Sequence, residues 1–83
     1  MDPVLQAYIP SDLAKAVLTQ CGVYTVMMLK AYDRSHLVSR SRYVLESNHI
    51  PNDPPNFSID RTVQDIVTMY DLLWHYVAEG ADD

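Results

Sequence analysis

The sequence predicts a small all-α protein, a three-helix bundle with a short N-terminal turn in which two long helices pack antiparallel. Apolar residues recur at three- and four-residue spacing over two long stretches, the spacing that places side chains on one helix face. Proline and glycine, which interrupt helices, are few and occur in a small number of places. A chain of 83 residues with 48% hydrophobic content suits one folded domain spanning residues 1–83.

The first expected element is the N-terminal turn of helix. Asp2 is a suitable N-cap, and Pro3 fits the first helical position, where a backbone N–H would be unpaired in any case. Pro10 disfavours helical geometry at the residue before it, so the turn is expected to end near Tyr8.

The first long helix is predicted over residues 11–33. Ser11 is its expected N-cap, and the carboxylate of Asp12 favours the positive end of the helix dipole. Apolar residues surround most of this helix, which is typical of a helix covered by other protein on several sides. Its main apolar face contains Leu13, Val17, Cys21, Tyr24, Met28 and Ala31.

A middle helix is predicted over residues 36–48, with Ser35 as its N-cap. Its weak apolar face consists of Leu37, Ser41, Val44 and Leu45. Residues 43–45 alone would also suit a short strand, but a single strand would have no pairing partner, so we favour a helix. An elbow rich in proline and asparagine follows at 50–57.

The last helix is predicted over residues 58–79, begun by Ser58 or Asp60 and ended by Gly80 before an acidic tail at 80–83. Six of its apolar residues fall within a sector of about 80°: Ile59, Val63, Ile66, Tyr70, Leu73 and Val77. Together the two long helices supply the predicted core: Leu13, Val17, Cys21, Tyr24, Met28, Val63, Ile66, Tyr70, Leu73 and Val77.

Charge argues against nucleic acid as a partner. The net charge is −5, whereas proteins that follow a phosphate backbone are expected to be basic. Residues 30–49 carry four Lys or Arg and two acids, and residues 53–83 carry seven acids and one Arg. A basic patch this dilute does not suit duplex binding, and the acidic last helix does not suit a recognition helix. We expect no DNA binding and do not favour RNA binding.

The single cysteine, Cys21, excludes an intramolecular disulfide and a cysteine-rich zinc site. The N-terminus lacks the charge order of a secretory signal, and no apolar stretch approaches the roughly 20 residues of a membrane span. We therefore expect a cytoplasmic protein that does not enter a membrane and needs no cofactor.

Arg42 and His49 are separated by six residues. This spacing resembles the Arg-x(4–6)-His pattern of small helical ribonucleases of the HEPN type. The resemblance implies that His49 would act as general acid and base, and that Arg42 would hold the phosphate, without a metal. The alternative interpretation is a surface arginine and a histidine near the negative end of a helix, which we favour.

Asp71, His75 and Glu79 share one face of the last helix. That face lies opposite the apolar sector, so a solvated surface accounts for these residues and no metal is expected.

The abundance of tyrosine and methionine, together with one tryptophan, favours a binding surface. The apolar residues outside the main sectors are its predicted contacts: Val26, Leu29, Leu72 and Tyr76. We expect a non-enzymatic interaction protein, an adaptor, an inhibitor or a small subunit of an assembly. A homodimer that meets near Val26 and Leu29 would cover the first long helix, and a stable hetero-complex is the alternative.

Overall fold

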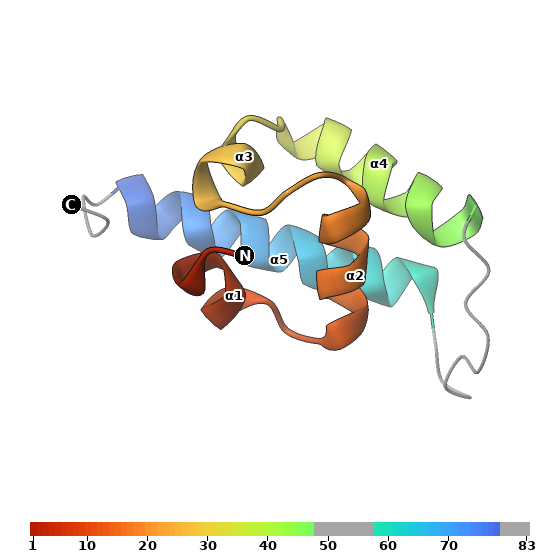
Figure 1. Cartoon of the computed structure of the whole chain (residues 1–83). Helices are drawn as coiled ribbons and strands as arrows, with labels where there is room; N and C mark the ends of the chain where they lie inside the picture. Colours follow the sequence, from red (N-terminus) through yellow and green to blue (C-terminus); the bar gives the residue numbers. More distant parts are fainter. Residues whose placement is uncertain (48–57, 79–83) are drawn as a thin grey trace.

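The computed structural model describes residues 1–47 and 58–78, with side chains up to residue 75. Within these ranges the secondary structure is helical, which confirms the all-α prediction. The helices are α1 (Pro3–Tyr8), α2 (Asp12–Gln20), α3 (Val26–Lys30), α4 (Arg34–Ser47) and α5 (Ile59–Ala78). In Figure 1, α5 runs the length of the molecule, with α4 along one side of it and α1, α2 and α3 in front.

Helix α1 follows the sequence prediction. The carboxylate of Asp2 accepts a hydrogen bond from the backbone N–H of Val4 at 2.8 Å, and Pro3 occupies the first turn. The helix ends at Tyr8 because Ile9, which precedes Pro10, is extended. Its one buried side chain, Leu5, anchors it to the core.

The uninterrupted helix predicted over residues 11–33 is wrong, because α2 ends at Gln20 and α3 begins at Val26. Gly22 has a positive φ of 78°, a conformation that residues with a Cβ adopt only at a cost. The N–H of Gly22 donates to the carbonyl of Thr19 at 3.0 Å, and the N–H of Val23 donates to the carbonyl of Leu18 at 2.9 Å. These two bonds form a Schellman motif, which ends α2.

A new helix start follows this motif at once. The hydroxyl of Thr25 accepts a hydrogen bond from the N–H of Met28 at 3.1 Å and so caps α3. Ser11 caps α2 in the same way, through the N–H of Ala14, as predicted. The segment therefore folds as two capped short helices joined by a turn.

Helix α4 begins at Arg34, and its cap is Asp33 rather than the predicted Ser35. The carboxylate of Asp33 accepts the N–H of His36 at 2.7 Å, and its carbonyl accepts the N–H of Leu37. Ser35 lies inside the first turn and donates its hydroxyl to the same carboxylate. Residue 48 and the predicted elbow at 50–57 lie outside the described residues.

Helix α5 starts as expected. Ser58 accepts the backbone N–H of Arg61 at 3.2 Å through its hydroxyl, and Asp60 lies in the first turn. The helix continues to Ala78, and residue 79 and the tail at 80–83 lie outside the described residues.

The antiparallel pair in this structure is α4 with α5, which make the most extensive helix contact. Two ion pairs fix their register: Arg34 with Asp71 at 3.1 Å and Arg42 with Asp60 at 2.6 Å. The earlier residue of α4 pairs with the later residue of α5, so the helices run in opposite directions (Figure 1). Because both pairs are largely exposed, they set register more than they stabilise the fold.

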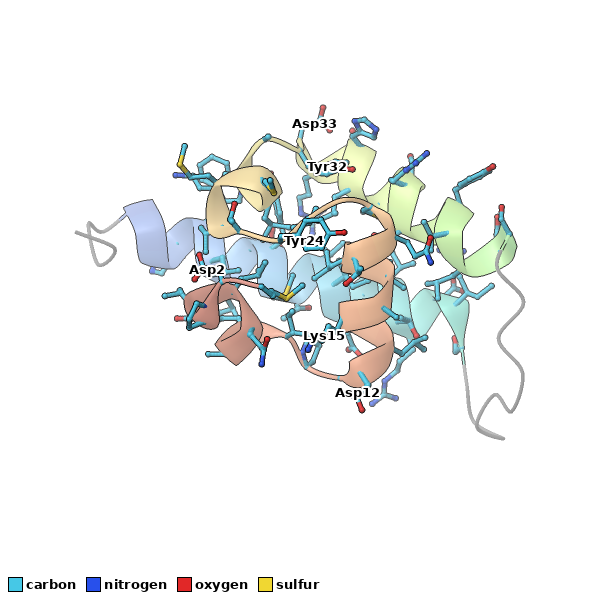
Figure 2. All side chains as sticks on the ribbon, viewed as in Figure 1. Asp2, Asp12, Lys15, Tyr24, Tyr32 and Asp33 are labelled. Atoms are coloured by element: carbon cyan, nitrogen blue, oxygen red, sulfur yellow. The ribbon has the colours of Figure 1, made fainter. Side chains whose placement is uncertain are left out.

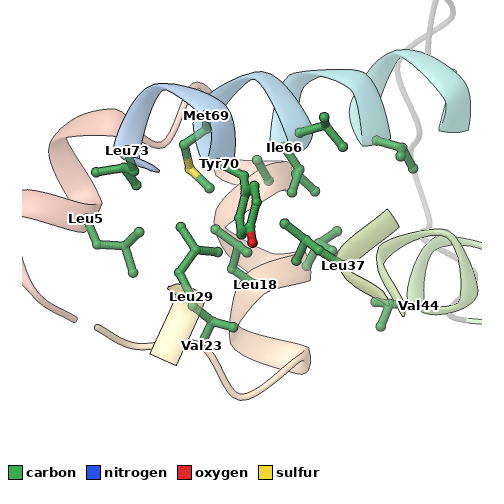
Figure 3. Packing of buried hydrophobic residues seen from close by; sticks show 14 of the residues in the cluster. Leu5, Leu18, Val23, Leu29, Leu37, Val44, Ile66, Met69, Tyr70 and Leu73 are labelled. Carbon is green, nitrogen blue, oxygen red and sulfur yellow. The ribbon is translucent and has the colours of Figure 1, made fainter. Parts of the chain in front are cut away.

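The core lies between α5 and the other helices, where Tyr70 and Ile66 meet leucines from α2, α3 and α4 (Figure 3). Five predicted core residues are buried: Val17, Val63, Ile66, Tyr70 and Leu73. Leu13 and Cys21 are partly buried beside them. The prediction is wrong for Tyr24 and Met28, which are exposed. The side chain of Val77 lies outside the described residues.

Candidate functional site

The structure separates the four predicted contact residues. Leu29 is fully buried in the core of the chain itself, so the prediction that it faces a partner is wrong. Val26 is partly buried against the same core. Leu72 is exposed, as the prediction requires. The side chain of Tyr76 lies outside the described residues.

The premise for these contacts also changes. A continuous helix over residues 11–33 would have left apolar residues exposed to solvent. Because the helix is interrupted at Gly22, Val23 and Leu29 are instead buried in the core. Any partner surface must therefore be located from the side chains that remain exposed.

Exposed large apolar side chains lie from the middle of the molecule toward the end at which α5 finishes (Figure 1 and Figure 2), and we name this region the apolar end. In the described part of the chain, this end is formed by the start of α1, the turn after α2, helix α3 and the later turns of α5, which lie together in Figure 1. Its members are Met1, Val4, Tyr24, Met27, Met28 and Trp74. Leu72 lies on the other flank of α5, and Tyr43 lies on α4.

One backbone hydrogen bond and one side-chain contact connect the parts of the apolar end. The N–H of Asp2 donates to the carbonyl of Tyr24 at 2.9 Å, which joins the start of α1 to the turn before α3 (Figure 2). At the other side, the ammonium group of Lys30 lies 4.7 Å from the centre of the Trp74 ring. Helix α3 is thus tied to α1 through its preceding turn and to α5 through its last residue.

The exposure of Met27 follows from the way α3 is oriented. Leu29 points into the core and is fully buried. Residues two positions apart lie about 200° apart around a helix, so Met27 points outward and is 81% exposed. Met27 and Lys30 are one turn apart and share a face, so Met27 lies on the side of α3 that extends to Trp74.

Trp74 is fixed in position although part of its ring reaches solvent. Tyr70 contacts it edge to face, with ring centres 6.1 Å apart, and Lys30 covers part of the ring. A partly exposed tryptophan held in one position loses little conformational entropy on binding, which is typical of the residues that dominate interface energies.

Two tyrosine hydroxyls form hydrogen bonds that connect the elements beneath this surface. Tyr70 of α5 donates to the carbonyl of Tyr32 at 2.6 Å, and the Tyr32 hydroxyl donates to the carbonyl of Cys21 at 2.9 Å. Through these two bonds, α5 is connected to the loop before α4 and to the turn after α2. The turns on both sides of α3 are therefore anchored.

Among the described residues, the apolar end carries few charges. The carboxylate of Asp2 is engaged by the N–H of Val4, and Lys30 lies on Trp74. Asp71, one turn of α5 away, is paired with Arg34 through two hydrogen bonds, and this pairing raises the pKa of the arginine. A surface of this kind favours apolar contact over recognition of a charged ligand.

Two shallow hollows flank the connection between α1 and α2. One, of about 150 Å³, is lined by Tyr8, Pro10, Asp65, Thr68, Met69 and Leu72. The other, of about 240 Å³, is lined by Gln6, Ile9, Pro10, Ser11, Asp12 and Lys15. Both are smaller than the roughly 300–1,000 Å³ of typical small-molecule sites. They do not form a substrate pocket.

The described residues include only Arg42 of the two residues in the ribonuclease hypothesis. The guanidinium of Arg42 is bound to the carboxylate of Asp60 at 2.6 Å, and His49 lies outside the described residues. For the metal hypothesis, Asp71 is occupied by Arg34, and Glu79 lies outside the described residues. Residues 1–47 and 58–75 contain no group of three side chains placed to hold a metal ion.

Cys21 is partly buried, and burial raises the pKa of its thiol. The thiol form therefore predominates at neutral pH, whereas thiol chemistry requires the thiolate.

No protein-family model, curated protein or solved structure matches this chain. None of the described helices combines the length and apolarity needed to cross a bilayer. The geometry of the surface is therefore the basis for a functional proposal.

Proposed function

We propose that this chain is a non-enzymatic protein–protein interaction module that binds a protein partner through the apolar end. The single observation that carries the proposal is the grouping of six exposed large apolar side chains at one end, with Met27 81% exposed. An adaptor, an inhibitor and a small subunit of an assembly would all use such a surface.

The size of the surface supports a protein partner. At about 150–250 Å² for a large side chain, the exposed fractions of the six residues amount to on the order of 600 Å². That value is an upper bound, because it includes polar and main-chain atoms, and it is comparable to the roughly 300–600 Å² found for the largest apolar patch of a typical monomer; such patches often mark interaction sites.

The residue types also support it. Methionine and aromatic residues are enriched in interface cores, where lysine and acids are depleted. Met27 and Met28 adapt to a partner surface because their side chains are flexible. Trp74 adds a rigid contact, since Tyr70 and Lys30 already hold its ring.

The area of the surface sets only an upper bound on the affinity. At roughly 25 cal/mol per Å², burial of this area yields on the order of 15 kcal/mol before losses. Association itself costs about 4–15 kcal/mol, and ordering of flexible side chains adds to that loss. The difference ranges from almost nothing to about 11 kcal/mol, so the buried area alone does not set the affinity.

Site-specific crosslinking tests the proposal. A photoreactive amino acid in place of Met27 should give a covalent adduct with a protein in the native host. The matched control carries the same group in place of Tyr43, which is 60% exposed but lies on α4 away from the apolar end. Adducts from position 27 and none from position 43 are expected. No adduct from position 27, or equal adducts from both positions, would refute the proposal.

A further inference from the structure

We infer that Met27 is an oxidation site, which hydrogen peroxide converts into the sulfoxide ahead of the other methionines, and that this modification weakens binding at the apolar end. The site of oxidation stands on the exposure of the methionines alone. Its effect on binding rests on the proposed function and adds a regulation to it.

The four methionines of the chain differ in how far solvent reaches them. Met27 is 81% exposed, Met28 is 45% exposed and Met1 is 39% exposed, whereas Met69 is 2% exposed. A dissolved oxidant must reach the sulfur atom, so susceptibility to oxidation follows exposure. Met27 is therefore the first expected target, and Met69 is protected by the core.

The modification transfers one oxygen atom. The sulfur of Met27 attacks an oxygen of hydrogen peroxide, an S–O bond forms, and the O–O bond breaks. A proton moves from the transferred oxygen to the departing one, so the products are methionine sulfoxide and water. The sulfur is oxidised by two electrons and the peroxide is reduced by the same two. A thioether needs no deprotonation, unlike a cysteine thiol, so no neighbouring base is required.

The fold of α3 does not depend on the Met27 side chain. Leu29 anchors this helix because it is fully buried, and the hydroxyl of Thr25 caps the helix through the backbone N–H of Met28. Neither contact uses the Met27 thioether, which lies in solvent. A sulfoxide at position 27 therefore adds a polar oxygen without displacing a packed atom, and the oxidised chain should remain folded.

Oxidation changes what the apolar end offers a partner. A thioether is apolar and flexible, whereas a sulfoxide is polar. A polar oxygen that is pressed against an apolar partner surface loses its hydrogen bonds to water without replacing them. Binding through the apolar end should therefore weaken at least about tenfold when Met27 is oxidised.

Peptide mass spectrometry of the purified full chain, treated with hydrogen peroxide at neutral pH, tests the site. Fragment ions from cleavage between residues 27 and 28 separate the two adjacent methionines. Met27 should gain oxygen about twofold faster than Met28, in proportion to their exposed fractions, and at least about tenfold faster than Met69. In urea the rates should converge, because the unfolded chain exposes all four sulfur atoms. Oxidation of any other methionine ahead of Met27 in the folded chain would overturn the inference, as would loss of the helical circular dichroism signal when only Met27 is oxidised.

The effect on binding is tested with a photoreactive amino acid in place of Val4 on α1, or of Tyr24 if Val4 gives no adduct, so that Met27 stays in the chain. Peroxide is removed before the chain meets an extract of the native host. Treatment should reduce the adduct of the wild type at least about tenfold. Met27→Leu keeps an apolar side chain without the sulfur and should retain its adduct after the same treatment. Met28→Leu is the matched control and should lose its adduct as the wild type does.

Three outcomes of this crosslinking overturn the effect on binding: an undiminished wild-type adduct, an equal loss in Met27→Leu, or no adduct from either position before treatment. The proposed function is judged separately, by the adduct from a photoreactive group at position 27 itself. If that adduct is absent, the function fails, whereas mass spectrometry still decides whether Met27 is the oxidation site.

Discussion

Gly22 gives the sharpest test of the fold, because the structure and the sequence pattern predict effects of opposite sign. In a continuous helix over residues 11–33, Gly22→Ala would stabilise the protein by about 0.5–1 kcal/mol, since glycine is a poor helix former. In the structure, Gly22 instead ends α2 with a φ of 78°. Alanine in that conformation is strained by roughly 1–2 kcal/mol.

The environment of Gly22 isolates this backbone effect. A Cβ added at Gly22 would meet no atom within 4 Å, so the substitution introduces no clash. Alanine also restricts the unfolded chain, which offsets about 0.4–1 kcal/mol of the strain. We expect Gly22→Ala to lower the free energy of unfolding by about 1 kcal/mol, and the melting temperature by about 4–8 °C.

Urea denaturation followed by circular dichroism at 222 nm measures the effect. Gly22→Asn is the matched control, because asparagine tolerates the left-handed region better than alanine does. It should therefore be the less destabilised of the two variants. An unchanged or raised midpoint for Gly22→Ala would refute the turn and restore the continuous helix.

Three further substitutions test the core, a buried hydroxyl and a helix cap. Leu73→Ala, at a fully buried position of α5, should lower the free energy of unfolding by about 2–5 kcal/mol in urea, and a loss below about 1 kcal/mol would contradict its central place. Ser41→Ala should leave stability unchanged or raise it by up to about 1 kcal/mol, because the buried Ser41 hydroxyl has no hydrogen-bond partner among the described residues; a clear loss in thermal melts would show that a bond exists. Hydrogen bonds from the His36 N–H and the Ser35 hydroxyl lower the pKa of Asp33, so its stabilising contribution is present above the unfolded pKa and is lost as pH falls through the lower folded pKa. Asp33→Asn should keep the cap at neutral pH and reduce the loss of stability between pH 5 and 2, and an unchanged acid profile would count against this cap.

Several elements could be predicted from the sequence because their signals are local. Asp2 and Pro3 begin α1, Ser58 begins α5, and the structure uses these groups as the sequence suggests. The apolar face of α5 was also predictable, since a single helix keeps one phase along its length. Ile66 and Leu73 are accordingly buried.

The errors between residues 21 and 33 share one physical cause. When a helix ends and a new one begins, the 100° step between successive residues is interrupted. The face predicted for a residue after Gly22 therefore does not follow from the residues before it. The sequence pattern predicts that Tyr24 and Met28 are buried and that Leu29 is exposed, whereas in the structure Tyr24 and Met28 are exposed and Leu29 is buried. The apolar pattern conceals the break, because Val23 and Leu18 are both fully buried on either side of the Schellman turn.

Sequence signals for the break and for the surface do exist. Glycine commonly ends a helix and threonine commonly caps the next one, and Gly22 and Thr25 have these two roles. With α3 started at Val26, the inward position of Leu29 requires Met27 to point outward. The grouping of α3 with α1 and α5 could not be inferred this way, because it depends on tertiary contacts such as that between Lys30 and Trp74.

The fold itself gives no reason for methionine at position 27. A side chain that is 81% exposed adds little to the core, and glutamate there would suit the first turn of α3 at least as well. Substitution should therefore shift the free energy of unfolding by no more than about 0.5 kcal/mol, the usual range at surface positions, when unfolding is measured at dilutions where the chain is unbound, because binding itself adds to apparent stability. If Met27→Glu leaves unfolding unchanged yet weakens partner binding, the residue acts in binding and not in folding. A Met27→Glu protein that is clearly less stable than the wild type would instead place Met27 in the fold, and the apolar end would lose its most exposed member.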